Sequence, residues 1–216
     1  MNPEKSDLHI HSDMSDGRMS VEEIISHASQ LRLDTIAITD HFGPCYGCIK
    51  ANPSTIERRG QFIRDVALQY PRVRVLDGAE LDINTDGSMV EVAEDVTPFE
   101  LVIGSIHQMT NSSLWVSLLG KVTKKYHFDI LGHWDGYLTT YRESDGEMAA
   151  EILADAGIVV ELSSRYPPKD YHFLIAARDA GCKFSLGSDA HWISAIGQLE
   201  SQLQLAEALE LPLAEF

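Results

Sequence analysis

The chain of 216 residues has no long hydrophobic segment. A run of about 18 or more apolar residues would be needed for a membrane-spanning helix, and none is present. The first predicted strand begins so close to the N-terminus that no signal peptide is expected. With 44% hydrophobic and 23% charged residues, the composition is typical of a globular protein. We therefore expect one domain, residues 1–216, and a cytoplasmic location without a membrane partner.

Cysteine is scarce. The chain has 3 cysteines, and this odd number fits a reducing compartment better than a framework of disulfides. Cys45 and Cys48 form a Cys-x-x-Cys motif, which is compatible with half of a zinc site or with a redox pair. Because no second such motif exists to complete four thiolate ligands, we expect ordinary loop thiols instead.

Positive charge is also scarce. The sequence has 17 Lys and Arg against 33 Asp and Glu, and its formal net charge is −16. A charge of this sign repels a phosphodiester backbone, so long nucleic acid is an unlikely partner. Part of the acidic surplus belongs to the candidate ligands named below, whose charge bound cations would offset. A small anionic substrate remains compatible with this balance.

Seven short apolar segments, rich in Ile, Val and Leu, are predicted as buried strands. They cover residues 7–11, 35–41, 73–80, 101–107, 129–133, 158–163 and 184–191. Amphipathic helices are predicted between them, at about 20–31, 53–70, 113–126, 144–156, 170–180 and 196–209, while 98–101 is the least certain helical segment. Ser20 and Glu23 form a capping box, and Gly157 and Gly181 are expected to end two helices. The alternation indicates an α/β fold with a parallel sheet.

Potential metal ligands lie at the ends of these strands or in the loops that follow them. Six of the nine histidines do so, whereas His27, His127 and His172 lie elsewhere. Strand ends are where parallel α/β folds place catalytic groups. The candidate ligands are His9, His11, Asp16, His41, Glu80, His107, His133, Asp189 and His191. The ends of seven strands can contribute to one ligand cluster only if the strands are arranged in a ring. We therefore favour a seven-stranded barrel over an open sheet.

These motifs resemble the PHP (polymerase and histidinol phosphatase) family along nearly the whole chain. His9-Ile10-His11 with Ser15-Asp16-Gly17 is similar to the first family motif, and Thr39-Asp40-His41 is similar to the second. Glu80, His107, His133, Asp189 and His191 follow in the family's order. The resemblance implies a single-domain, distorted TIM-like (β/α)7 barrel that holds two or three divalent ions, usually zinc, manganese or iron. Imidazole and carboxylate ligands without thiolates suit these same metals.

A cluster of adjacent divalent ions favours phosphoester hydrolysis, because such ions activate water and stabilise both the entering and the leaving oxygen. Arg165, after the sixth predicted strand, is the preferred phosphate-binding residue, and Arg142 and Lys169 are weaker candidates. We expect a phosphomonoesterase for a small phosphorylated metabolite, with histidinol phosphate as the named example. One alternative is a nucleotide phosphatase or exonuclease. Another is a catalytically silent metal-binding accessory domain, against which the intact ligand set argues.

Overall fold

The computed structural model describes residues 2–45 and 47–216 and contains one curved sheet of seven strands. The strands are β1 (Ser6–Ile10), β2 (Thr35–Ile38), β3 (Arg74–Asp82), β4 (Leu101–Ser105), β5 (Ile130–Leu131), β6 (Val159–Ser163) and β7 (Phe184–Gly187). Every neighbouring pair is parallel, and the spatial order follows the chain order. The connections therefore all return over the outside of the sheet.

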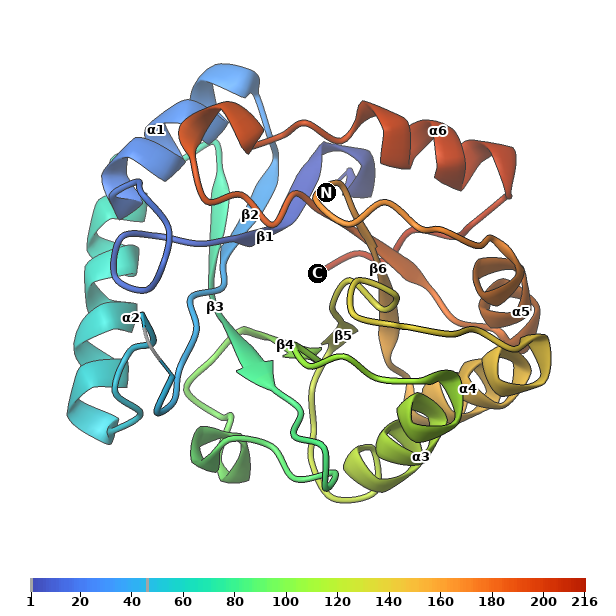
Figure 1. Cartoon of the computed structure of the whole chain (residues 1–216). Coiled ribbons are helices and arrows are strands. Elements are labelled where there is room, and N and C mark those ends of the chain that lie inside the picture. The colour runs from blue at the N-terminus through green and yellow to red at the C-terminus, as the bar shows by residue number, and fades with distance from the viewer. Residues whose placement is uncertain (1, 46) are drawn as a thin grey trace.

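The sheet curls until its two edge strands meet. Beyond the ends of β1 and β7, the N–H of His11 donates to the carbonyl of Ala190 at 2.9 Å, and the N–H of Ala190 donates to the carbonyl of His9 at 3.3 Å. Figure 1 shows the strands at the centre with helices around them. The architecture is the α/β barrel predicted from the sequence. It is distorted, because the register of β1 and β2 shifts between Asp7 and Ile10 and because β5 has only 2 residues.

Six α-helices form the outer layer among the described residues. They are α1 (Val21–Leu31), α2 (Pro53–Ala67), α3 (Ser112–Val122), α4 (Glu143–Ala156), α5 (His172–Ala180) and α6 (Glu200–Ala208). The predicted capping box is present at α1, where Ser20 Oγ accepts from the N–H of Glu23 at 3.2 Å. Gly157 and Gly181 end α4 and α5 in the left-handed conformation, as predicted.

The connection between β3 and β4 differs from the other predicted connections. No α-helix forms there among the described residues, and the segment contains the short 3-10 helix η2 (Glu91–Glu94) instead. Residues 98–101, the least certain predicted helix, lead directly into β4. Two further 3-10 helices, η1 (Pro3–Lys5) and η3 (Ile193–Ala195), lie before β1 and after β7.

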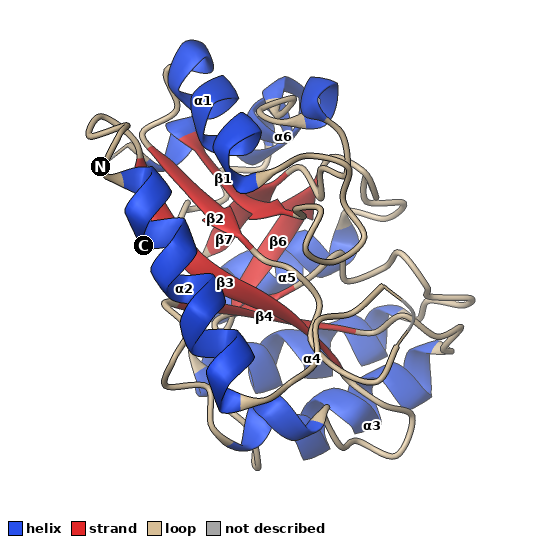
Figure 2. Ribbon diagram, turned by 90° about the vertical axis from the view of Figure 1, so that its left-hand side faces the viewer, coloured by secondary structure: helices blue, strands red, loops and turns tan. Residues whose placement is uncertain are grey.

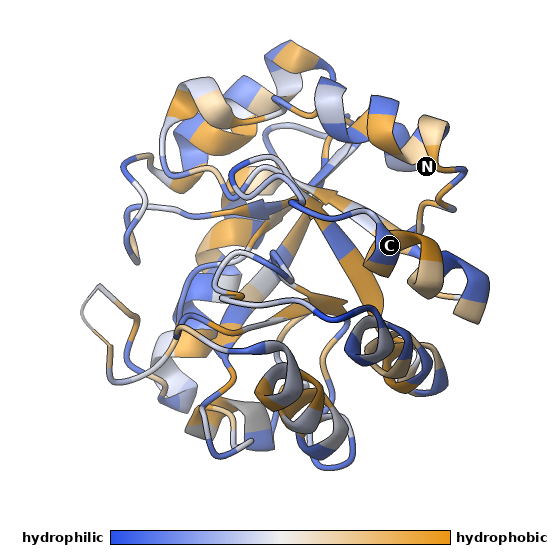
Figure 3. Cartoon of the chain, turned by 45° about the vertical axis from the view of Figure 1, so that its right-hand side comes forward, coloured by the Kyte–Doolittle hydropathy of each residue, from blue (hydrophilic) through white to orange (hydrophobic). Residues whose placement is uncertain are grey.

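The helices pack on the sheet through apolar faces. Ile24 and Ala28 of α1 join one buried cluster with Ile36 of β2, and all three side chains are fully buried. Figure 2 shows α2 in front of the sheet, and α2 packs against β3. Hydrophobic and hydrophilic residues alternate along the helices in Figure 3, as expected for helices with one buried face. This packing fixes the strands whose ends carry the candidate ligands.

Candidate metal centre

The site begins with two histidines of β1. His9 lies within the strand and His11 follows its last residue. Residues two apart on a strand point to the same side, and the two ring centroids lie 5.0 Å apart. Both side chains are fully buried. The same spacing recurs after β7, where Asp189 and His191 face His11 from the closing edge of the barrel.

The carboxylate of Glu80, on β3, lies at the middle of the histidines. Its side chain is 1% exposed. Its two oxygens lie 3.0 to 3.4 Å from the Nε2 atoms of five residues, namely His9, His11, His41, His107 and His133. Burial alone would raise the pKa of Glu80, but the imidazoles of His9, His41 and His107 hold the pKa well below its usual range. Glu80 is thus placed to act as a charged ligand shared between sites.

Two more carboxylates close the opposite side of the site. Asp189 Oδ1 lies 3.3 Å from His11 Nε2, and Asp16 Oδ2 lies 3.0 Å from His191 Nε2. Burial would raise the pKa of Asp189, but His9 and His11 lower it to about 2. Asp16 is more exposed than the others, with 39% of its side chain accessible. The centre therefore opens to solvent on the side of Asp16.

The donor atoms fit divalent cations. They form four overlapping groups whose ligand atoms all lie within 4.8 Å: His9, His11 and Glu80; His11, Asp16 and His41; His11, Asp189 and His191; and His41, Glu80 and His107. Four buried imidazole nitrogens among the described residues have no hydrogen-bond partner: His9 Nε2, both nitrogens of His11, and His133 Nδ1. Because buried polar atoms are normally paired, these nitrogens match the needs of a metal site.

Two of the candidate ligands have backbone conformations that side chains rarely adopt. The φ angles are 23° at His133 and 50° at Asp189, both in the positive range that favours glycine. Such strain persists only where the surrounding structure holds it, and it concentrates at functional sites. Each of these residues lies two positions after the last residue of a strand, β5 or β7, at the carboxyl end of the barrel.

Asp40 shapes the loop that carries Asp16. Its Oδ1 accepts from the N–H of Ser12 and from Ser15 Oγ, both at 2.7 Å. On its other side, Arg59 Nε donates to Asp40 Oδ2 at 2.9 Å. Burial would raise the pKa of Asp40, but the guanidinium of Arg59 and the hydroxyl of Ser15 bring it below its usual value. Asp40 is therefore a charged anchor for the Asp16 loop.

Two carboxylates position histidine rings from behind. Glu161 on β6 lies 2.7 Å from His9 Nδ1, and its other oxygen accepts from the N–H of His133 at 2.5 Å. Asp82 on β3 lies 2.6 Å from His107 Nδ1. Such contacts fix the ring orientation and leave the Nε2 atom free for a metal.

Sequence reasoning missed Asp82 and Arg59. Asp82 lies two residues after Glu80 on the same strand, and that spacing places both side chains on one side. Arg59 lies between Ile56 and Ile63 on the buried face of α2, where a charged residue requires a partner. The spacing of Asp82 and the position of Arg59 can both be read from the sequence. Neither feature identifies the residue that Asp82 or Arg59 contacts, because that residue lies on another element.

A cleft of about 240 Å³ lies over the centre, and we call it the metal cleft. Candidate ligands Asp16, His41, Glu80, His107, Asp189 and His191 line it, together with Tyr137, Arg165 and Tyr166. Arg165 Nη1 lies 3.3 Å from Asp189 Oδ1, and 35% of the Arg165 side chain is exposed. Its guanidinium is thus available to a substrate that enters the metal cleft.

The other two predicted substrate-binding residues do not line the metal cleft. Arg142 lies just before α4 and pairs with Asp145, with Nε 2.8 Å from Oδ2. Lys169 Nζ donates to the carbonyl of Asp135 at 2.9 Å. Because both cations are bound to other groups of the protein and lie away from the cleft, they are not carried into the proposed site.

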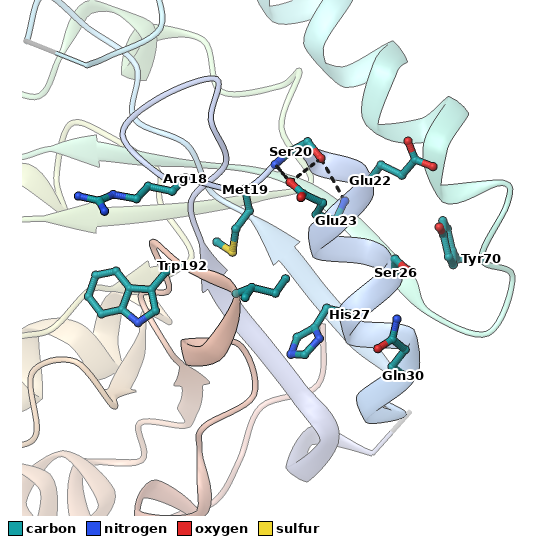
Figure 4. Close-up of a pocket in the computed structure, with 11 residues that line it drawn as sticks. Arg18, Met19, Ser20, Glu22, Glu23, Ser26, His27, Gln30, Tyr70 and Trp192 are labelled. Carbon is teal, nitrogen blue, oxygen red and sulfur yellow. Dashed lines mark hydrogen bonds between the residues drawn. The ribbon is translucent and has the colours of Figure 1, made fainter.

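The aromatic residues near the ligands are dispersed in the structure. Tyr166 lines the metal cleft, whereas Trp134 is buried and packs against Trp115 and Phe173. Trp192 lines a separate pocket of about 570 Å³ beside α1. Figure 4 shows it there, close to Arg18 and Met19. The pocket beside α1 shares no lining residue with the metal cleft.

The thiol groups of Cys45 and Cys48, which were expected to be ordinary loop thiols, are in contact in the structure. A turn in which the N–H of Cys48 approaches the carbonyl of Cys45 at 3.3 Å brings the two residues together. Their Cα atoms lie 5.3 Å apart, within the range that a disulfide spans. Cys182 is free and buried. Cys45 also lines the metal cleft, so this loop forms part of its rim.

The fold and the site together define a barrel with a histidine and carboxylate centre at the carboxyl ends of its strands. The model of the PHP domain family matches residues 7–165. The chain belongs to this family. No described helix is long and apolar enough to cross a membrane.

Two curated relatives are similar along most of the chain. The DNA polymerase/3'-5' exonuclease PolX of Bacillus subtilis is 29% identical over 212 residues, which cover 94% of this chain but only 37% of PolX. The probable phosphatase YcdX of Shigella flexneri is 27% identical over 229 residues, covering 96% of this chain and 86% of that protein. The chain therefore corresponds to a minor part of PolX and to most of YcdX.

Two solved structures share the fold. Histidinol phosphate phosphatase of Lactococcus lactis, complexed with zinc, L-histidinol and phosphate, superposes with a TM-score of 0.76 at 19% identity, over 99% of this chain and 97% of that one. A protein of Listeria monocytogenes named "putative histidinol phosphatase hisK" gives a TM-score of 0.72 at 14% identity, over 91% and 99% of the two chains. At these identities the likeness establishes the barrel and leaves the substrate open.

Proposed function

We propose that residues 1–216 form one metal-dependent phosphoesterase domain that hydrolyses the phosphomonoester of a small phosphorylated metabolite. The observation that carries this proposal is the convergence of the nine candidate ligands on one centre, which lies beneath a cleft that also receives Arg165. The probable phosphatase YcdX and the zinc, histidinol and phosphate complex of the Lactococcus structure support the same class of reaction. Histidinol phosphate is the first substrate to test.

The residues would hold two or three divalent ions, with zinc, manganese or iron as the fitting metals. When bound, such ions supply positive charge for the phosphate and lower the pKa of a water molecule. The remaining work belongs to the chain. Arg165 would bind a phosphate oxygen with its guanidinium, and Glu161 and Asp82 would keep the rings of His9 and His107 in place.

A nucleotide phosphatase or an exonuclease is the second candidate. It is favoured by the similarity to PolX, whose name includes a 3'-5' exonuclease activity. The net charge of −16 opposes the binding of long nucleic acid but is compatible with a mononucleotide. The small volume of the metal cleft, about 240 Å³, also favours a terminal phosphate over an internal diester.

The test joins metal analysis with a substrate panel. Protein loaded separately with zinc, manganese and iron is assayed on p-nitrophenyl phosphate, bis(p-nitrophenyl) phosphate, histidinol phosphate, mononucleotides and a short oligonucleotide. Preferential hydrolysis of monoesters supports the proposal, and release of nucleotides from the oligomer supports the second candidate. If metal-loaded protein hydrolyses none of these esters, both enzymatic proposals are contradicted.

Variants connect the activity to the centre. His9→Ala and Asp189→Ala should abolish turnover and lower metal content while the far-UV circular dichroism stays unchanged. His127→Ala is the matched control, because the side chain of His127 is 78% exposed and lies outside the centre. Normal activity of His9→Ala and Asp189→Ala would contradict the ligand assignment.

A further inference from the structure

A second cavity adjoins the metal cleft and has a different character. Its volume is about 560 Å³. It shares Cys45 and Asp82 with the metal cleft, so the two spaces meet along these residues. We call it the side pocket. The pocket beside α1 in Figure 4 is of similar size but shares no lining residue with the metal cleft.

The walls of the side pocket are largely apolar. They include Phe42, Pro44, Ala51, Met89 and Val90. Phe42 and Met89 are only 2% and 5% exposed, and Ala51 and Val90 pack on the same hydrophobic cluster. Well-packed walls of this kind give a pocket a fixed shape, and apolar walls favour the apolar part of a ligand.

The side pocket also contains charge. Lys50 lines it and is exposed, and it supplies the only cationic side chain among the described lining residues. Asp82 is the only anionic one among them, and its Oδ1 is already 2.6 Å from His107 Nδ1. A ligand in this pocket therefore meets an apolar wall and an available ammonium group.

The volumes of the metal cleft and the side pocket indicate that one ligand would occupy both. Small-molecule pockets usually measure about 300–1,000 Å³. The metal cleft, at about 240 Å³, falls below this range, and the side pocket lies within it. The metal cleft has room for the phosphate group, and the rest of a metabolite needs additional space. The shared edge at Cys45 and Asp82 leads into that space.

We propose that the side pocket binds the alcohol part of the phosphate ester, and that the preferred alcohol has a flat or branched apolar body with an anionic group for Lys50. This inference rests on the proposed function and names its substrate class. It ranks such an alcohol above histidinol, whose cationic amino group would be repelled by Lys50. It assigns specificity to residues 42–45, 50 and 51 and to Met89 and Val90, outside the candidate ligands.

The experiment measures binding of a product alcohol, so that it does not depend on turnover. 6-Hydroxy-2-naphthoate is fluorescent, flat and anionic, and 2-naphthol is its uncharged counterpart. Both are titrated into wild type and variants, with and without added zinc. Ala51→Phe fills the pocket and should weaken both ligands more than tenfold. Lys50→Glu should weaken the naphthoate about tenfold and 2-naphthol less than twofold, because a charge contact becomes a repulsion.

Control measurements distinguish changes in the shape and charge of the side pocket from loss of the folded structure. Lys124→Glu makes the same charge change at an exposed position after α3 and should alter neither affinity. Circular dichroism and Tm show whether Ala51→Phe is folded, and Lys50→Glu tests the pocket independently because Lys50 is exposed. If wild type binds neither alcohol, or if a folded Ala51→Phe and Lys50→Glu both bind like wild type, the inference is overturned.

The outcome is distinct from that of the proposed function. Hydrolysis of the phosphate ester of 6-hydroxy-2-naphthoate is measured in parallel on metal-loaded protein. Binding that responds to Ala51→Phe without hydrolysis of any monoester supports the pocket and contradicts the phosphomonoesterase. Hydrolysis with kcat/KM unchanged in Ala51→Phe and Lys50→Glu supports the phosphomonoesterase and overturns the pocket.

Discussion

Replacement of Glu161 by Gln gives the sharpest test of how the centre is organised. Glu161 is 2% exposed and uses its two oxygens for two partners, His9 Nδ1 at 2.7 Å and the N–H of His133 at 2.5 Å. A glutamine has nearly the same shape but only one acceptor oxygen. Its amide nitrogen would face either the His133 N–H or the His9 ring. Glutamine therefore cannot keep both contacts unless the His9 ring changes its tautomer.

The size of the effect follows from the loss of a contact or the change of tautomer. A hydrogen bond to a charged group contributes about 1.5–3 kcal/mol, which corresponds to roughly 10- to 100-fold in an equilibrium constant. If the amide donates to His9 Nδ1, the ring proton moves to Nε2, and that nitrogen can no longer bind a metal. Either arrangement weakens metal binding at the centre. Mutation of a group that hydrogen-bonds to a metal-binding histidine typically lowers metal affinity by the same 10- to 100-fold.

Competition with a zinc chelator provides the assay. Wild type and Glu161→Gln are titrated with zinc in the presence of the chelator, and zinc content is measured after dialysis. Glu151→Gln is the matched control, because Glu151 lies on the exposed side of α4. We expect a 10- to 100-fold loss of zinc affinity in Glu161→Gln alone. Equal affinity in a folded Glu161→Gln protein would refute the positioning role.

Three further predictions concern Arg165, Arg59 and Cys182. Arg165→Ala should raise KM for a phosphomonoester about tenfold with a smaller change in kcat. Arg72→Ala, at an exposed position, is the control and should change neither constant. An unchanged KM in Arg165→Ala would exclude phosphate binding by Arg165. Arg59→Met leaves both Asp40 and Asp77 buried without their cation and should lower the free energy of unfolding in urea by about 3–5 kcal/mol. A loss below about 1 kcal/mol would contradict the role of Arg59 as a buried anchor. Burial raises the pKa of Cys182 to about 11, so its thiol stays neutral at pH 8. The Cys182 thiol should therefore react with Ellman's reagent only when the protein unfolds. Rapid reaction of Cys182 in the native protein would contradict this prediction.

Local patterns in the sequence were sufficient for the elements of the fold. The seven apolar segments and the helices between them appear in the predicted order, with bounds that differ by several residues at some ends. The capping box at Ser20 and the glycines after α4 and α5 were readable because each depends on neighbours within a few residues. The pair of Arg142 and Asp145, three residues apart, is also local, but it was not predicted, because Arg142 was named as a substrate-binding candidate instead.

The tertiary structure decided which distant side chains meet. Lys169 is held by Asp135, Arg59 pairs with Asp40, and the side pocket joins the metal cleft beside Cys45, and none of these follows from spacing along the chain. The sequence alone placed the candidate ligands at or near the carboxyl ends of strands, because strand periodicity and residue type are local properties. How the ring closes, what lies behind each ligand and where a substrate finds room depend on contacts between segments far apart in sequence, which only the packed barrel defines.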